Sequence, residues 1–148
     1  MRDGFLKLRD YATVIECVPI LCVDIDLVTE IDAVTDGHVL FKRCNEPLKG
    51  EWWVLGGRIF KGETAIDAVR RKLKEEAGLG IQPPLKFTGF YEDTYDFSSI
   101  GRGKYHTVSL MFEMRCDPSK IVLDSQHSEW MISQTLPKRL DVQVGTVV

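Results

Sequence analysis

The residues best suited to chemistry are four charged side chains at helical spacing, Glu63, Arg71, Glu75 and Glu76. Glu75 and Glu76 stand in the last helical turn before Gly78, where the partial negative charge of a helix C-terminus destabilises a carboxylate by about 0.3–1 kcal/mol. Helix stability therefore does not explain them. Adjacent carboxylates with nearby backbone oxygens suit Mg²⁺, which keeps waters for a phosphate substrate. The pattern predicts metal-assisted chemistry on a phosphate compound.

A plainer interpretation is that these charges form surface ion pairs. Arg71 and Glu75 are four residues apart, as are Lys72 and Glu76. Such pairs stabilise an exposed helix by about 0.2–0.5 kcal/mol, and the base-first order found here is the weaker orientation. For these residues taken alone, both interpretations remain open.

Two glycines precede the helix and extend the pattern. Gly56 and Gly57 allow a backbone carbonyl or amide to approach a metal or a phosphate closely. Five residues separate Gly57 from Glu63, seven separate Glu63 from Arg71, and the run then continues as Lys72, Leu73, Lys74, Glu75, Glu76, Ala77, Gly78 and Leu79. This arrangement resembles the Nudix box, which has glycine, glutamate, arginine and aliphatic residues at these separations. The matching positions are Gly57, Glu63, Arg71, Glu75, Glu76 and Gly78.

The resemblance implies both a fold and a cofactor. The fold would be α/β, a Nudix-type α/β/α sandwich with a mixed β-sheet and a central loop–helix metal motif, and the cofactor Mg²⁺, with Mn²⁺ as an alternative. One position departs from the family. Lys72 follows Arg71 directly, where Nudix pyrophosphatases commonly have a Glu that binds metal or acts as the base for attack at phosphorus. This departure puts attack at phosphorus in doubt.

The GDP-mannose mannosyl hydrolase subgroup also lacks that Glu, and the chain resembles it over nearly its whole length. The matching segments are Tyr11-Ala-Thr-Val, Pro19 through Asp24, Lys42-Arg43 with Asn45 and Pro47, Trp53 through Arg58, Tyr95-Asp96, His106, and Gln126-His127. The resemblance implies hydrolysis of GDP-mannose or GDP-glucose by attack at the anomeric carbon, which gives GDP and free sugar.

The resemblance also assigns roles around the metal. Gln126, Glu76 and the carbonyl of Gly56 would bind Mg²⁺, and Glu75 would either hold a second metal or pair with Arg71. His127 would be the base, because an ordinary imidazole pKa of about 6.5 suits proton abstraction at neutral pH.

Further residues are predicted to contact the substrate. Arg43 and Arg58 suit the diphosphate, because planar guanidinium groups bind phosphate oxygens in pairs. Asp24 lies in an apolar run where an unpaired carboxylate is costly, and the resemblance puts it at the sugar end as a catalytic group. Tyr11 would stack on guanine and Tyr95 would line the sugar pocket, although both also fit as core aromatic residues.

Two other functions compete with this one. The first is a Nudix pyrophosphatase that splits the P–O–P bond of ADP-ribose, another nucleotide sugar or a nucleoside triphosphate. The second is a nucleotide-sugar sensor without turnover, since a fold does not fix a function. Asp93 and Thr107 stand where the subgroup has His and Tyr, which leaves the identity of the sugar open.

The elements that would position these residues follow from apolar periodicity and turn residues. The mixed order of strands around one strong helix favours an α/β sandwich over a doubly wound array. The expected elements are strands at 12–26, 37–44 and 52–55, a helix from near Glu63 to Gly78, a hairpin of 86–95 with 104–115, a short strand at 121–123, a turn holding Gln126 and His127, and a last helix from about Ser133.

Composition sets the remaining limits. The 148 residues, 44% hydrophobic and 28% charged, fit a single domain over 1–148. The net charge of -3 argues against bulk nucleic-acid binding. The apolar run from Val18 to Val23 is too short to span a membrane. Because the four cysteines show no paired spacing, we expect a reducing cytoplasm. A homodimer is implied by the resemblance only.

Overall fold

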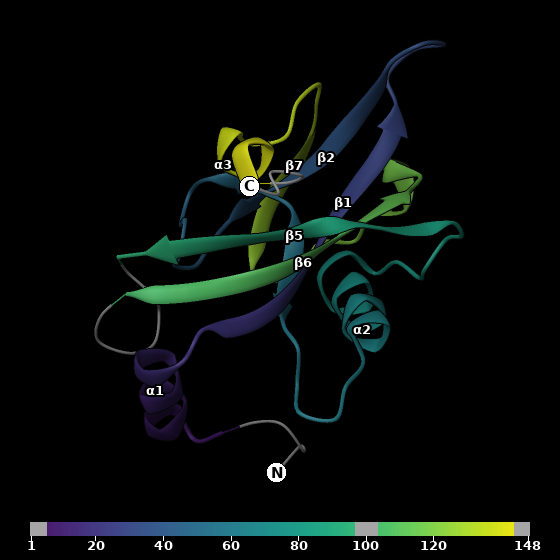
Figure 1. Cartoon of the computed structure of the whole chain (residues 1–148). Coiled ribbons are helices and arrows are strands. Elements are labelled where there is room, and N and C mark those ends of the chain that lie inside the picture. The colour runs from purple at the N-terminus through teal and green to yellow at the C-terminus, as the bar shows by residue number, and fades with distance from the viewer. Residues whose placement is uncertain (1–5, 97–103, 144–148) are drawn as a thin grey trace.

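A computed structural model describes residues 6–96 and 104–143 (Figure 1). The elements follow one another along the chain as α1 (Leu8–Cys17), β1 (Ile20–Glu30), β2 (Asp36–Arg43), β3 (Trp52–Trp53), β4 (Leu55–Arg58), α2 (Ala65–Ala77), β5 (Leu85–Tyr95), β6 (Tyr105–Arg115), the short 3₁₀ helix η1 (Pro118–Lys120), β7 (His127–Ser133) and α3 (Lys138–Gln143).

The strands form one mixed sheet in the order β3-β2-β1-β6-β5, with β4 paired to β1 and β7 paired to β2. β1 and β6 run parallel, from Ile20 opposite Thr107 to Val28 opposite Arg115, and the other pairs are antiparallel. β1 is central in the sheet and is buried along most of its length, and its Val23, Ile25 and Leu27 pack in the core under α2. The expected mixed sheet is confirmed.

The helix α2 is defined at both ends by its sequence. The Thr64 hydroxyl accepts a hydrogen bond from the Asp67 N–H at 3.1 Å and caps the N-terminus. Gly78 ends the helix in the left-handed conformation, with φ of 67°, which a residue with a side chain rarely adopts. The apolar face of α2 packs against β1 and β4, which fixes the charged residues of the helix relative to the sheet.

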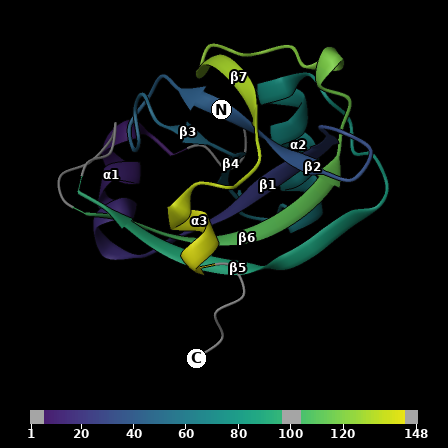
Figure 2. The same cartoon turned by 90° about the horizontal axis from the view of Figure 1, so that it is seen from above.

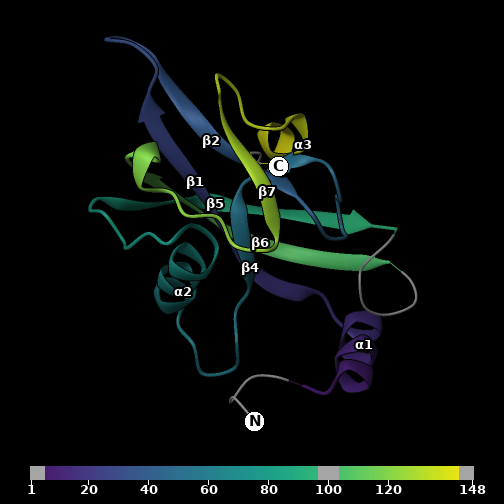
Figure 3. The ribbon, with the colours of Figure 1, turned by 180° about the vertical axis from the view of Figure 1, so that it is seen from behind.

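Helices cover both faces of the sheet, as expected for an α/β/α sandwich. α2 lies on one side and α3 on the other (Figures 1 and 3). The core under α2 contains Val69 and Leu73, and the core under α3 contains Leu140, Tyr91 and Met111. The helix α1 lies apart from both, near the start of β1 and β6 (Figure 2). Its Ile15 packs on Ile20 and Cys22.

Three expected elements were placed wrongly. Residues 12–17 belong to α1, because Tyr11, Val14 and Ile15 form a helical face that packs on the sheet and outweighs the β-branched residues. Residues 121–123 form no strand, since the Val122 N–H bonds the carbonyl of Ala77 at the end of α2. The last helix begins at Lys138, directly after a proline.

Most of the other expected elements are confirmed. The 37–44 strand is β2, the Trp-rich segment is β3 followed by β4, and the hairpin pairs β5 with β6 from Leu85 opposite Met114 to Tyr95 opposite Tyr105. His127 opens the strand β7 instead of standing in a turn. No helix among the described residues has the length and apolar character needed to cross a bilayer.

Candidate active site

The loop before α2 is held to the helix by an ion pair. The carboxylate of Glu63 accepts hydrogen bonds from Arg71, at 2.7 Å from Nε and 2.9 Å from Nη2, and from the Phe60 N–H at 2.9 Å. Arg71 Nη2 also donates to the carbonyl of Arg58 at 3.0 Å. The hydrogen bond from Arg71 lowers the pKa of Glu63 below its ordinary value. The pair braces the loop of residues 58–64.

Glu75 belongs to the same outward-facing group. Its side chain is 45% exposed, and Arg71 Nη1 donates to it at 3.3 Å. The sequence left open whether Glu75 holds a second metal or pairs with Arg71, and in the structure it pairs with Arg71.

On the inner side of α2, Lys72 and Glu76 form a buried ion pair. The Lys72 ammonium contacts Glu76 Oε1, and the residues are 8% and 2% exposed. Glu76 Oε2 accepts the N–H of Gly56 at 3.3 Å. A Cβ on Gly57 would lie 2.9 Å from Lys72 Cε, so a larger residue there would require the lysine side chain to shift. The residue that departs from the Nudix box therefore occupies the middle of the loop–helix motif.

Next to this pair lies a cavity of about 230 Å³. Aromatic side chains form much of its wall, which suits the stacking of a base or a sugar. Cationic side chains also reach it, which suits a phosphate. The lining comprises Tyr11, Ile15, Cys22, Asp24, Arg43, Glu46, Pro47, Leu48, Trp53, Gly56, Gly57, Lys72, Tyr91, Tyr95, Tyr105, Thr107, Ser109 and Gln126.

Asp24 is a buried carboxylate that faces this cavity. The Tyr91 hydroxyl donates to Asp24 Oδ2. Burial raises the pKa of Asp24 to about 7, while hydrogen bonds from Tyr91 and Ser109 and the charge of Arg43 act in the opposite direction. Asp24 can therefore take up or release a proton near neutral pH.

Tyr91 was not singled out from the sequence, although a signal for it exists. Tyr91, Asp93 and Tyr95 alternate along β5 and are all buried, so they share one face of the strand. Asp93 pairs with Arg139 of α3, whose Nε lies 2.7 Å from Asp93 Oδ2. The Arg139 guanidinium also lies 5.0 Å from the centre of the Tyr95 ring. These contacts put the Asp93 carboxylate and the Arg139 guanidinium beside Tyr95, which is predicted to line the sugar pocket.

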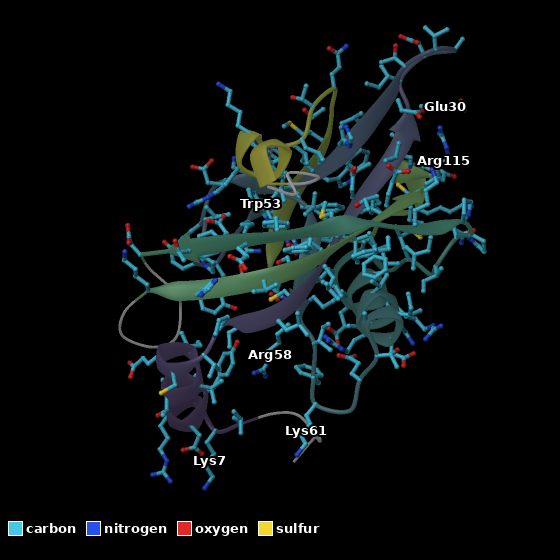
Figure 4. The ribbon with its side chains drawn as sticks, in the orientation of Figure 1. Lys7, Glu30, Trp53, Arg58, Lys61 and Arg115 are labelled. Carbon is cyan, nitrogen blue, oxygen red and sulfur yellow. The ribbon has the colours of Figure 1, made fainter. Side chains whose placement is uncertain are left out.

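The two arginines predicted for the diphosphate lie in different places. Arg43 lines the cavity, and its Nε donates to the Pro47 carbonyl at 2.8 Å. Arg58 lies between α1 and the loop that leads to α2 (Figure 4), 4.1 Å from the centre of the Tyr11 ring and 4.9 Å from that of Phe60. Arg58 lines a neighbouring groove that shares Tyr11 with the cavity.

Gln126 stands in the turn before β7, and His127 is the first residue of that strand. Gln126 lines the cavity, and its Nε2 donates to Asp124 Oδ2 at 3.0 Å. His127 is 5% exposed, with Nδ1 3.0 Å from Asp124 Oδ1 and its ring edge-on to Phe41 at 5.6 Å. His127 is not among the residues that line the cavity. The structure therefore brings Asp24, Arg43, Tyr11, Tyr95 and Gln126 together and does not bring His127 among them.

Fold and loop–helix motif together define a class of protein. Residues 31–143 match the NUDIX domain. The chain therefore belongs to the Nudix family of hydrolases.

Individual proteins of known name are similar to this chain in sequence or in fold. The chain is 34% identical over 121 residues to the low-salt glycan biosynthesis protein Agl8 of Haloferax volcanii, covering 81% of this chain and 74% of that protein. It is 33% identical over 103 residues to an ADP-ribose pyrophosphatase of Methanocaldococcus jannaschii, covering 68% of this chain and 57% of that protein. The NUDIX domain of Shewanella oneidensis NrtR, solved with ADP ribose, superposes with a TM-score of 0.64 at 18% identity, covering 84% of each chain, which establishes the fold.

Proposed function

We propose that the protein hydrolyses a nucleoside-diphosphate-linked sugar at the anomeric carbon and releases nucleoside diphosphate and free sugar. GDP-mannose and GDP-glucose are the first substrates to test. The observation that carries the proposal is Lys72, a buried cation paired with Glu76 at the position where Nudix pyrophosphatases commonly have a carboxylate.

Attack at phosphorus is poorly supported by the charges around α2. Glu63 and Glu75 both bond Arg71, and Glu76 contacts the Lys72 ammonium. Among residues 6–96 and 104–143, no three His, Cys, Asp or Glu side chains gather closely enough to hold a metal ion. Activating a water for attack at phosphorus commonly relies on such a cluster.

Attack at carbon needs a base beside the sugar and a cation at the diphosphate. Asp24 meets the first need, since it faces the cavity and its pKa is raised to about 7 by burial. A water would attack the anomeric carbon and give its proton to Asp24, while the bond between that carbon and the diphosphate oxygen breaks and its electron pair leaves with the diphosphate. Arg43 would neutralise the departing charge.

His127 remains the base that the family resemblance predicts. To act on a cavity substrate, its ring would have to leave the contacts with Phe41 and Asp124. Substituting His127→Gln separates the two assignments: a loss of turnover by orders of magnitude with unchanged binding would favour His127, and nearly normal turnover would leave Asp24 as the base.

The relative involved in glycan biosynthesis supports a sugar-linked substrate, because glycans are built from nucleotide sugars. Walls formed by Tyr11, Trp53 and Tyr95 suit both a base and a sugar ring. A homodimer, also implied by the resemblance, stays a prediction.

The second candidate is cleavage of a P–O–P bond, favoured by the relative that is an ADP-ribose pyrophosphatase. Incubating the protein with a panel of nucleotide sugars and ADP-ribose, and following products by phosphorus NMR, separates the candidates. Nucleoside diphosphate would support the proposal. Nucleoside monophosphate with sugar phosphate would establish the second candidate, and binding without products would favour a sensor.

A further inference from the structure

The inner face of α2 contains a fixed positive charge at the place where the Nudix pattern predicts a metal. Lys72 lies next to Gly57, and its ammonium contacts Glu76 Oε1. The second oxygen of Glu76 is bonded by the Gly56 N–H at 3.3 Å. Both carboxylate oxygens of Glu76 therefore already have a partner from the protein.

Among the other predicted metal ligands, Glu75 bonds Arg71 on the outer face. Gln126 donates through its Nε2 to Asp124 Oδ2. A divalent ion on Glu76 would lie beside the Lys72 ammonium in a buried site, where like charges repel strongly. With the Lys72 ammonium in contact with its carboxylate, Glu76 does not fit a divalent ion.

Lys72 also faces the cavity. It lines the same space as Arg43, Gly56 and Gly57. An ammonium group has three N–H donors. A phosphate oxygen in the cavity could therefore accept a hydrogen bond from Lys72 while the contact with Glu76 persists.

We propose that the Lys72 ammonium takes the place of the divalent cation at Glu76, keeps such ions out of this site, and binds the diphosphate of the substrate directly. The last part rests on the proposed function, because it requires a diphosphate in the cavity. The ligand class is a diphosphate group, whatever base or sugar is attached to it. The rival explanation is that Lys72 serves folding alone, by neutralising Glu76.

The test measures two binding events that need no turnover. Mn²⁺ alone is titrated by calorimetry into wild type, Lys72→Met and Glu76→Gln. Inorganic pyrophosphate, which has neither base nor sugar, is titrated into wild type and Lys72→Met in EDTA. Lys74→Met is the matched control, because Lys74 is exposed on the same helix. If Lys72→Met does not fold, Lys72→Met combined with Glu76→Gln takes its place in the pyrophosphate titration, since both partners are then neutral.

We expect wild type to bind no Mn²⁺ at Glu76 and to bind pyrophosphate in EDTA. Lys72→Met should bind Mn²⁺ about tenfold tighter or more, be stabilised against heat by it, and bind pyrophosphate in EDTA about tenfold more weakly. Lys74→Met should behave as wild type.

Any of three results would overturn the proposal. Wild type could bind Mn²⁺ in a way that Glu76→Gln abolishes, it could fail to bind pyrophosphate in EDTA, or Lys72→Met could bind pyrophosphate as well as wild type does. Neither titration depends on hydrolysis. If the protein cleaves its substrate at phosphorus, the proposed function is wrong, but the Mn²⁺ and pyrophosphate titrations still test the role of Lys72.

Discussion

Each side of α2 carries one cation and one carboxylate and has a second carboxylate nearby from another segment, and the two sets behave differently. On the outer side, Glu63 and Glu75 both bond Arg71, and the pKa of Glu63 is lowered by that contact. On the inner side, Glu76 pairs with Lys72, while the nearby Asp24 on β1 is left with a pKa raised by burial. In the outer set both carboxylates bond Arg71 and hold the loop before α2. The inner set borders the cavity, and its Asp24 carboxylate can exchange a proton.

Substituting Asp24→Asn should have the largest effect, since it removes the proton acceptor at the cavity. We expect turnover to fall by about 10²–10⁴ with little change in substrate binding. The matched control is Asp26→Asn, a buried carboxylate two residues further along β1 that bonds His38 at 2.9 Å outside the cavity. Similar losses in both variants would mean that burial, not chemistry, distinguishes Asp24.

Substituting Lys72→Met should lower the free energy of unfolding by about 3–5 kcal/mol, because it leaves Glu76 charged, buried and unpaired. Urea unfolding measures this, and Lys72→Met combined with Glu76→Gln should recover most of the loss. If Lys72→Met alone is as stable as wild type, water reaches Glu76 and the Lys72–Glu76 pair is not buried.

The raised pKa of Asp24 predicts how stability depends on pH. The pKa is about 7 in the fold against an ordinary 3.8, so between these values the folded protein holds a proton that the unfolded chain releases. Wild type should therefore lose stability relative to Asp24→Asn as the pH rises from about 4 to about 7, by at least about 1 kcal/mol. Parallel stability curves, from urea unfolding across this range, would contradict the assignment.

On the outer side, Arg71→Met should lower the free energy of unfolding by about 1–2 kcal/mol. It removes the hydrogen bonds to Glu63 and to the Arg58 carbonyl in a partly exposed place. Because the brace fixes the loop beside Tyr11, turnover should fall less than in Asp24→Asn. A larger loss of unfolding free energy in Arg71→Met than in Lys72→Met would contradict this comparison of the two sides.

Glu75→Gln should have the smallest effect, a few tenths of a kcal/mol at most, because an exposed ion pair four residues apart on a helix contributes about that much. Turnover and metal response should not change. A loss of activity here would revive a second metal at Glu75.

Much of the fold could be predicted from the sequence, and the failures have physical causes. The pattern that starts helix α2 at Thr64 and ends it at Gly78 is local, so it could be read directly. The segment 12–17 could not, because its β-branched residues favour a strand, and the helix is supported by packing of its apolar face against Ile20 and Cys22.

The site was less predictable, because it depends on which face of an element each residue occupies. The sequence marks Lys72 as a departure from the family pattern and predicts its pairing with Glu76 only as a surface contact. Its burial follows from the packing of α2 on β4, which the spacing of the charges does not contain. Gln126 and His127 are neighbours in sequence and both bond Asp124, but of the two it is Gln126 that lines the cavity, a difference that the sequence does not contain.

The most direct test of the central claim is hydrolysis of GDP-mannose in oxygen-18 water, with mass spectrometry of both products. Attack at the anomeric carbon predicts labelled mannose and unlabelled GDP. Label in GDP, or in GMP or mannose phosphate, would place the attack at phosphorus and contradict the account built on Lys72 and Asp24.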